Sequence, residues 1–491
     1  MNYRLVFKLL SGILFALSAA FLVCLGVAFY YAGRAGEERA VFGFALSVIL
    51  SAMFGGLFYT IGRTASKRLF QKEALFVIGS GWLLASLVGA IPYQIIVPGI
   101  SPVDAFFESA SGFTTTGASI FSDIEGLPHS LLFWRSLSQW IGGMGVVVFF
   151  VAILSFLGAG GKILYANEAS GHTADFEESR IQTAVKNLWF LYLALSALCT
   201  LVYWLGGMDW FDAICHMFTT LSTGGFSTRN ASLAAFQSPL LEWSTTLFMV
   251  VGGTSFLLIL QVVRGRFHLI RKNTEFHAYT VILIAATFAV AFFLIRDDLA
   301  SGWHHALRGA AFQVSSIMTT TGFATEDFGA WSSFPKVLLL VLMMIGGCTA
   351  STAGGMKVIR LVIGIRSSIN SVEKSYRPSV VRQIVVNGRT VDEDFVRDVL
   401  AYLVILAIIG LASIPLTALF EPDISVDGNI SAVIACLFNI GPGLAEVGPT
   451  HNYANLHDYT KLLLSVLMVM GRLELYAILV LFSPSLWRQF S

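Results

Sequence analysis

Long apolar runs alternate with shorter polar segments along almost the whole of this 491-residue chain. A helix needs about 20 mostly apolar residues to cross the hydrocarbon of a bilayer. Runs of that length occur at about 8–31, 40–62, 74–97, 131–158, 186–206, 239–263, 277–295, 334–364, 398–420 and 460–483. The pattern therefore predicts an all-α protein that crosses a membrane ten times.

The composition supports a membrane protein. Hydrophobic residues make up 56% of the chain and charged residues only 12%, whereas soluble domains carry about 25% charged residues. The net charge of +1 gives no indication of a nucleic-acid partner. The five cysteines stand singly in apolar stretches, so we interpret them as small hydrophobic residues and not as metal or redox ligands.

Basic residues are unevenly divided among the predicted loops. They gather at 63–72, 159–186, 264–276 and 357–397, whereas few occur in the alternate loops 98–130, 207–238, 296–333 and 421–459. By the positive-inside rule the basic loops face the cytoplasm. We therefore expect a multi-pass protein with both termini in the cytoplasm.

A short Thr/Ser-Gly phrase occurs in each of the four outward-facing loops. Each copy follows a segment that is too short to span the membrane and too apolar for a free loop, which is typical of a re-entrant half-helix. Non-helical backbone at that depth persists only where it lines a watery cavity or is buried in protein. The sequence therefore predicts a two-helix extension and then four units, each a span, a pore helix, a loop and a span, at 1–70, 71–160, 183–265, 275–365 and 393–483.

The four phrases carry the groups that a filter for a monovalent cation needs. Rings of backbone carbonyls replace the water shell of a cation in selective filters. Glycine permits the backbone angles that aim those carbonyls inward, and threonine or serine adds hydroxyl oxygens. In the fourth copy Asn439 and Ile440 replace the hydroxyl pair, so a hydroxyl ring is incomplete there. The predicted ligands are Thr115, Thr116 and Gly117; Ser222, Thr223 and Gly224; Thr320, Thr321 and Gly322; and Asn439, Ile440 and Gly441.

A run of small residues interrupts the predicted span 334–364. It consists of Gly346, Gly347, Cys348, Thr349, Ala350, Ser351, Thr352, Ala353, Gly354 and Gly355. Small residues let helices pack closely in membranes, and we assign the isolated pairs Gly142-Gly143 and Gly252-Gly253 to that role. The longer run instead favours an intramembrane loop beneath the filter, because a helix contact does not need so many small residues.

Few charged residues lie within the predicted spans. Arg472 is midway along the last one, where a charge costs at least about 3 kcal/mol, so it must face the helix bundle or the ion pathway. Either Glu474 or a carbonyl neutralises it, or it acts on passing ions. His216 is expected to be a buried packing residue. Three acidic residues are expected near outer helix starts, where they complement the helix dipole: Asp104, Glu108 and Asp212.

These features together resemble the Trk/Ktr/HKT superfamily of potassium transporters over nearly the whole chain. The four phrases resemble the filter segments of that family. The stretch Trp134–Gly145 resembles its first inner helix and Gly346–Lys357 its third. The two leading spans resemble its bacterial TrkH/TrkG branch.

The resemblance implies potassium uptake across a bacterial inner membrane through a filter made by four pore loops in a pseudo-fourfold arrangement. It also implies that the small-residue run is a gate and that Arg472, below the filter, hinders cations. Potassium is then the substrate, and no cofactor is expected in this chain. The implied partners are a second copy in a homodimer, the lipid bilayer and a cytosolic ring of nucleotide-binding TrkA-type regulatory subunits.

Two alternatives stay open. Tetrameric potassium channels have a second filter glycine, but Ser119, Phe226 and Ala324 stand at that place here and only Gly443 keeps it. A sodium-permeable or poorly selective transporter of the same fold is therefore the alternative to a potassium-selective one. The sequence also does not decide between a channel and proton- or sodium-coupled symport. No Walker A motif or acid–base cluster occurs, so we expect no enzymatic activity.

Overall fold

The computed structural model describes residues 2–65, 71–156, 178–380 and 382–482. Its regular structure is helical apart from one short antiparallel hairpin, in which β1 (Val385–Val386) pairs with β2 (Arg389–Thr390). Three of the basic residues used for the orientation, Lys67, Arg68 and Lys162, lie outside the described residues, as does the predicted end of the first unit.

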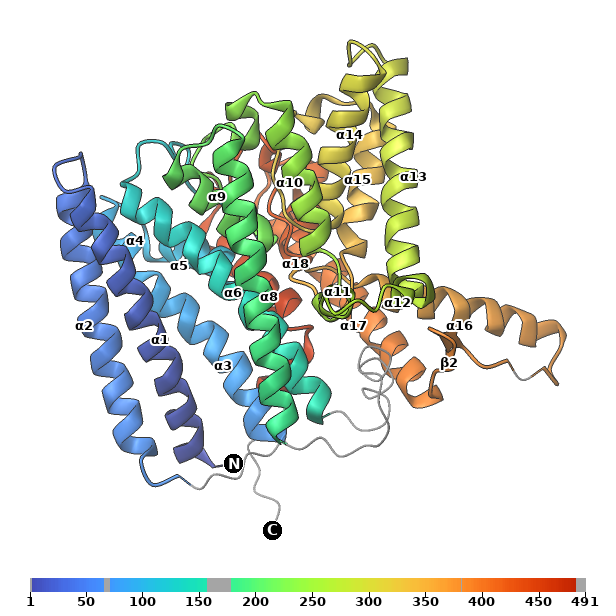
Figure 1. Ribbon diagram of the computed structural model, residues 1–491, viewed down its shortest axis with the longest axis horizontal. Coiled ribbons are helices and arrows are strands. Elements are labelled where there is room, and N and C mark those ends of the chain that lie inside the picture. The colour runs from blue at the N-terminus through green and yellow to red at the C-terminus, as the bar shows by residue number, and fades with distance from the viewer. Residues whose placement is uncertain (1, 66–70, 157–177, 381, 483–491) are drawn as a thin grey trace.

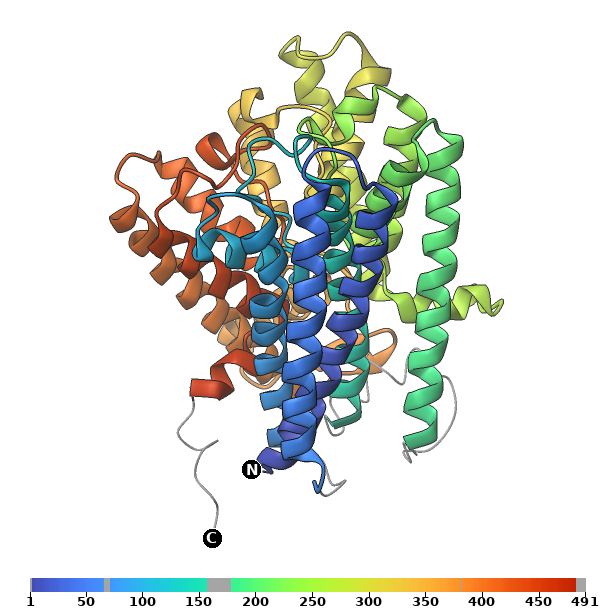
Figure 2. The ribbon, with the colours of Figure 1, turned by 90° about the vertical axis from the view of Figure 1, so that its left-hand side faces the viewer.

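Two long leading helices, α1 (Tyr3–Tyr30) and α2 (Glu37–Gly62), lie side by side at one edge of the molecule (Figures 1 and 2). They approach closely because Gly62 carries no side chain: a Cβ there would lie 2.6 Å from the carbonyl oxygen of Arg4. Their inner face is buried around Phe21 and Phe44, and Phe21 contacts Trp134 of a later helix with ring centroids 4.6 Å apart. The pair is thereby packed onto the rest of the bundle.

The helices that follow repeat one order four times: a long helix, a short helix, a loop and an inner helix. The long helices are α3 (Gln71–Gly89), α8 (Glu178–Leu205), α13 (Thr274–Arg296) and α17 (Glu393–Phe420). The short helices are α5 (Pro102–Phe113), α9 (Trp210–Leu221), α14 (Trp303–Met318) and α18 (Val426–Leu437). The inner helices begin with α6 (His129–Phe156), α10 (Pro239–Gly252), α15 (Ser333–Ile345) and α19 (Asp458–Arg472).

Shorter elements connect or end these units. They are α4 (Ile91–Ile96), α11 (Phe256–Val263), α12 (His268–Lys272), α16 (Val358–Tyr376) and α20 (Tyr476–Leu479), with single 3₁₀ turns at Ser232–Phe236, Phe328–Ala330, Ala445–Val447 and Val480–Phe482. Helix α16 projects sideways from the bundle (Figure 1).

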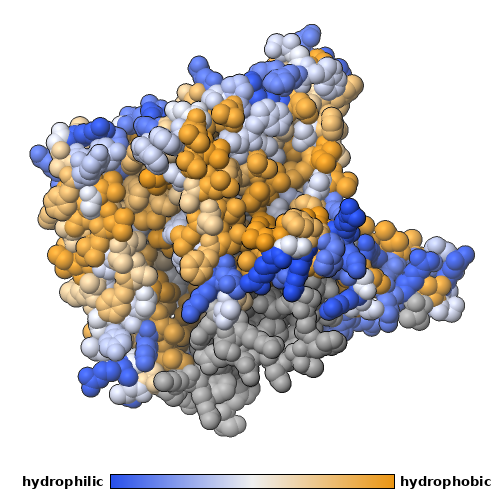
Figure 3. Space-filling view, in the orientation of Figure 1, coloured by the Kyte–Doolittle hydropathy of each residue, from blue (hydrophilic) through white to orange (hydrophobic). Residues whose placement is uncertain are grey.

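The outer surface of the bundle is apolar over its middle. In the described chain six helices are long and apolar enough to cross a membrane, or eight if each of two bent helix pairs is counted as one span. Of the other two predicted spans, 131–158 reaches the edge of the described residues and 334–364 is interrupted. Figure 3 shows apolar side chains over the middle of one face, with hydrophilic residues gathered toward its upper edge and around α16.

Three of the four inner helices are broken. The chain bends by 102° between α10 and α11 and by 115° between α19 and the segment Tyr476–Phe482. Between α15 and α16 it leaves helical geometry from Gly346 to Lys357, where the sequence predicts an interruption. Gly252 and Gly253, which we assigned to helix packing, instead lie at the first of these bends. In contrast, α6 runs without a break from His129 to Phe156.

Candidate ion filter and intramembrane loop

The four short helices each end directly at a Thr/Ser-Gly phrase, and the backbone then follows the same course in all four. Thr115, Thr223, Thr320 and Asn439 have φ angles of 51°, 53°, 57° and 59°. Two residues further on, Gly117, Gly225, Gly322 and Gly441 have φ angles of 85°, 79°, 83° and 96°. Asparagine tolerates this left-handed region better than most residues, so the divergent fourth phrase keeps the backbone of the others.

This correspondence corrects the register of the second phrase. Gly225, and not Gly224, has the backbone angle and position of Gly117, so the predicted set Ser222, Thr223 and Gly224 begins one residue early. The place of a second channel glycine moves with it, from Phe226 to Ser227. Because the second phrase has two consecutive glycines, Gly224 and Gly225, the sequence alone could not show which of them corresponds to Gly117.

The four phrases form a closed ring. A Cβ added to Gly117 would lie 2.2 Å from the carbonyl oxygen of Gly224, and one added to Gly225 would lie 1.9 Å from that of Thr321. The same holds for Gly322 against Ile440 at 2.0 Å and for Gly441 against Thr116 at 2.7 Å. Each phrase therefore contacts the next, and the fourth contacts the first. The carbonyls that meet the neighbouring glycines at this level belong to Thr116, Gly224, Thr321 and Ile440.

Most hydroxyls of the phrases are engaged within the protein. Thr114 Oγ1 and Thr116 Oγ1 are 2.8 Å apart, and the Nδ2 group of Asn439 donates to Thr116 Oγ1 at 2.9 Å and to the Met468 carbonyl at 2.8 Å. Thr115 Oγ1 and Asn439 Oδ1 are buried and have no hydrogen-bond partner among the described residues. These two oxygens are available to a ligand.

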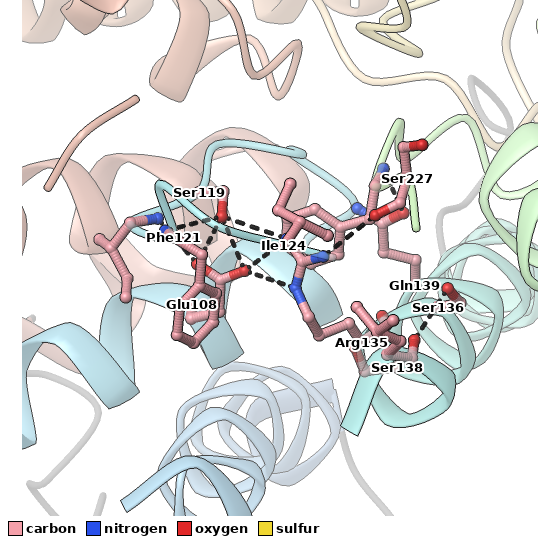
Figure 4. A network of polar contacts seen from close by, with 12 residues as sticks. Glu108, Ser119, Phe121, Ile124, Arg135, Ser136, Ser138, Gln139 and Ser227 are labelled. Atoms are coloured by element: carbon pink, nitrogen blue, oxygen red, sulfur yellow. Dashed lines mark hydrogen bonds and ion pairs between the residues drawn. The ribbon is translucent and has the colours of Figure 1, made fainter. Parts of the chain in front are cut away.

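A buried ion pair supports the first phrase from behind (Figure 4). Arg135 Nε donates to Glu108 Oε1 at 2.8 Å, and the second carboxylate oxygen accepts from the Ile120 backbone N–H at 2.9 Å. The remaining donors of Arg135 reach Ser119 Oγ at 3.1 Å and the carbonyl of Ser227, in the second phrase, at 3.2 Å. A buried charge pair is stable when such further hydrogen bonds satisfy it.

Our interpretation of Glu108 as a residue near a helix start is therefore wrong: it lies in the second half of α5 and binds Arg135. An arginine inside a predicted span needs a partner, and this signal at Arg135 was present in the sequence. His216 is buried as expected. Its ring nitrogens are 2.8 Å from the Asp212 carbonyl and 2.9 Å from Ser227 Oγ.

The other two outer carboxylates lie in the first turns of their helices, where they were expected. Both have basic partners: Asp104 is 2.5 Å from Lys461 Nζ, and Asp212 is 2.5 Å from Arg229 Nη2. The hydrogen bond to Asp212 raises the pKa of the Arg229 guanidinium, so this side chain stays positively charged. In the described chain no group of three or more His, Cys, Asp and Glu residues could hold a metal ion.

The segment from Gly346 to Lys357, here called the intramembrane loop, is largely buried beneath the phrases. It is bonded to the break in the second inner helix: Cys348 N donates to the Gly253 carbonyl at 2.8 Å, and the Ala350 carbonyl accepts from Phe256 N at 3.0 Å. It is also bonded to the phrases, since Gly354 N donates to Thr320 Oγ1 at 2.6 Å. Gly355 N donates to the Phe438 carbonyl at 3.1 Å. The loop thus supplies partners for backbone groups that the helix break leaves unpaired.

One buried basic side chain, Arg472, contacts the loop, and another, Lys357, ends it. Arg472 Nη1 donates to the Thr352 carbonyl at 2.6 Å, while its Nε and Nη2 atoms have no hydrogen-bond partner among the described residues. Glu474 pairs with Arg360 instead. Of the partners that we considered for Arg472, the structure therefore supplies the carbonyl and not the carboxylate. Lys357 Nζ lies 2.5 Å from the Ala353 carbonyl.

A carboxyl group in the first turn of α13 anchors the loop. Glu275 Oε1 accepts from Thr349 N at 2.7 Å, from Thr349 Oγ1 at 3.0 Å and from Ile359 N at 3.2 Å. The preceding residue, Thr274, exchanges two hydrogen bonds with Asn387 of the β hairpin, at 2.7 and 3.1 Å. The loop and the hairpin are therefore connected through two adjacent residues of α13.

Known proteins are similar to this chain in sequence and in architecture. The family described as TrkH, cation transport protein, matches residues 43–489. The Trk system potassium uptake protein TrkH of Salmonella typhimurium is 33% identical over 499 positions that cover 100% of both chains. The Trk system potassium uptake protein TrkG of Escherichia coli (strain K12) is 30% identical, with 99% of each chain covered. The crystal structure of the potassium transporter TrkH from Vibrio parahaemolyticus matches with a TM-score of 0.90 at 32% identity, covering 99% of this chain and 100% of that one.

Proposed function

The chain belongs to the TrkH family of cation transport proteins, and we propose that it is the potassium-conducting subunit of a Trk-type uptake system in a bacterial inner membrane. The observation that carries this proposal is the closed ring of four phrases, each with a left-handed residue, a glycine two residues on and a carbonyl against the next phrase. Such a ring of carbonyls replaces the water shell of a cation. The membrane potential, worth about 2.3 kcal/mol per charge per 100 mV, drives uptake.

The proposed filter comprises three positions in each of four units. They are Thr115, Thr116 and Gly117; Thr223, Gly224 and Gly225; Thr320, Thr321 and Gly322; and Asn439, Ile440 and Gly441. The units themselves follow the predicted division at 71–160, 183–265, 275–365 and 393–483, after the extension 1–70. The repeated element order supports this division.

The intramembrane loop is the proposed gate. It lies beneath the phrases and is held there by hydrogen bonds to the phrases and to the break between α10 and α11. If the loop moves, these bonds break and their backbone groups lose their partners. Arg472, bonded to the Thr352 carbonyl, places a second obstacle to cations beside it. When the loop moves, Arg472 loses its hydrogen bond to the Thr352 carbonyl and becomes exposed to water, and both changes open the ion pathway.

The partners proposed for the chain are a second copy in a homodimer and a cytosolic ring of TrkA-type nucleotide-binding subunits. The basic segments 159–186, 264–276 and 364–397 are the surfaces offered to the ring, and of these residues 159–177 lie outside the described residues. Both termini then lie in the cytoplasm by the positive-inside rule. The hairpin within 364–397 is bonded to Thr274, so contact there reaches Glu275 and the loop.

A sodium-permeable transporter of the same fold is the second candidate. It is favoured by Ser119, Ser227 and Ala324, which replace a second glycine in three phrases and so shorten the ladder of carbonyls. Uptake of potassium, rubidium and sodium into liposomes containing the purified protein separates the two candidates. Equal rates for sodium and potassium support the second.

Growth of a potassium-uptake-deficient bacterial strain at low potassium tests the main proposal. The wild-type chain should restore growth, and Gly117→Ser, Gly225→Ser, Gly322→Ser and Gly441→Ser should each reduce it. Gly99→Ser is the matched control because Gly99 has a φ of +77° but open space around it and lies outside the ring, the loop and the basic segments. Full rescue by all four filter variants at wild-type protein levels contradicts the proposal.

A further inference from the structure

One side chain of the first inner helix reaches into the second phrase. Gln139 on α6 is buried, and its Nε2 group donates to the Gly224 carbonyl at 2.7 Å. Its Oε1 atom accepts from the Phe226 backbone N–H at 3.1 Å. Because a backbone N–H only donates, the contact with Phe226 fixes the orientation of the amide, and the NH₂ group must face Gly224. Figure 4 shows Gln139 on the same helix as Arg135, which bonds Ser227.

The carbonyl that Gln139 contacts belongs to the ring. Gly224 O faces Gly117 as Thr321 O faces Gly225, Ile440 O faces Gly322 and Thr116 O faces Gly441. In the part of the chain that the structure describes, no side chain donates to the other three carbonyls. One of the four ring carbonyls is therefore fixed by a side-chain amide and the other three are not.

The glycine at position 224 is explained by the same contact. Its φ is not in the left-handed region, unlike that of Gly225. A Cβ on Gly224 would lie 2.4 Å from Cδ and from Oε1 of Gln139. The corresponding residues of the other phrases, Thr116, Thr321 and Ile440, all carry side chains. Gly224 thus makes room for the amide of Gln139, while Gly225 adopts the left-handed backbone conformation of the turn.

We propose that Gln139 is a positioning residue that sets the preference of the filter for potassium over sodium. Its hydrogen bond holds the Gly224 carbonyl in place and uses part of its acceptor capacity. A carbonyl held in this way cannot move inward around a smaller ion, and its weaker field favours the larger, more weakly hydrated one. This inference rests on the proposed function, because it concerns the same ring.

Competition between potassium and sodium for uptake into liposomes tests the proposal. Gln139→Leu removes both hydrogen bonds and should lower the potassium-over-sodium preference by about threefold to tenfold, the range expected for one net hydrogen bond. The matched control is Gln94→Leu, since Gln94 is exposed and donates to the Ile100 carbonyl at 2.9 Å, away from the ring. The control should keep the wild-type preference.

Gln139→Glu provides a second test, which can be used even if the leucine variant does not fold. It measures a pH dependence of the ion preference that a change in packing alone would not produce. The introduced carboxyl keeps the acceptor for Phe226 N. When protonated it donates an O–H to the Gly224 carbonyl, and when ionised it does not. The preference of this variant should therefore fall as the pH rises, while that of the wild type stays flat. If both variants keep the potassium-over-sodium preference of the wild type at every pH, this inference is wrong but the proposed function still stands. A wild-type protein that carries no potassium overturns the proposed function and this inference with it.

Discussion

Glu275 is the most informative position at which to test the gate. It lies in the first turn of α13 and accepts three hydrogen bonds from the intramembrane loop and the start of α16, two of them from the backbone N–H groups of Thr349 and Ile359. Glu275→Gln keeps the shape of the side chain and removes its charge. If the loop must leave this anchor to let ions pass, the substitution weakens the closed conformation and leaves the open one unaffected.

The size of the effect follows from the contacts. A hydrogen bond to a charged group contributes about 1.5–3 kcal/mol and one between neutral groups about 0.5–1.5 kcal/mol. Loss of the charge therefore costs about 1 kcal/mol for each of the two backbone N–H groups, or about 2 kcal/mol for the closed loop. Since 1.36 kcal/mol is a factor of ten, the ratio of open to closed protein should rise about 30-fold.

Rubidium uptake into liposomes by the purified chain, without regulatory subunits, measures that ratio while most molecules are closed. We expect Glu275→Gln to raise the initial rate about 30-fold. Glu421→Gln is the control, because Glu421 is also buried but accepts from His457 N at 2.7 Å, far from the loop in the structure. A folded Glu275→Gln protein with the wild-type rate refutes the assignment of the loop as a gate anchored by this residue.

Three further substitutions test other parts of the pathway. Arg472→Ala removes a buried cation and its hydrogen bond to the loop, so rubidium uptake should increase at least severalfold; a wild-type rate would leave the arginine a structural role only. Gly322→Ala places a Cβ 2.0 Å from the Ile440 carbonyl at a φ of +83° and should abolish uptake, whereas Gly99→Ala, with a φ of +77° and open surroundings, should not. Arg135→Leu leaves Glu108 buried and unpaired at a cost of about 3–5 kcal/mol, and the thermal unfolding midpoint in detergent should fall by several degrees. An unchanged midpoint would mean that the ion pair does not stabilise the filter.

The spans and the four phrases were predictable because each is encoded locally. A run of about 20 apolar residues marks a crossing wherever it occurs, and a phrase such as Thr319–Gly322 carries both the hydroxyls and the glycine that its backbone needs. The solved transporter confirms the all-α membrane fold that these patterns predicted.

What sequence reasoning missed depends on contacts between distant residues. The register of the second phrase is decided at Gly224 by Gln139, which is 85 residues earlier in the chain. The bend after Gly252 is stabilised by a hydrogen bond donated by Cys348 N and one accepted by the Ala350 carbonyl, about a hundred residues later, so an ordinary Gly-Gly pair gave no sign of it. Glu108 contacts the first phrase as half of an ion pair only because the packing of α6 places Arg135 beside it.

The four phrases of the ring belong to one polypeptide and differ from one another, as Thr116, Gly224, Thr321 and Ile440 show. In a pore assembled from four identical subunits every mutation is installed four times, so a change worth roughly threefold at one ligand becomes about 80-fold in the assembly if the effects add. In this chain a single mutation changes only one of the four phrases. A change at a ring position that tolerates substitution can therefore alter one quarter of the ring and leave the other three quarters as they are.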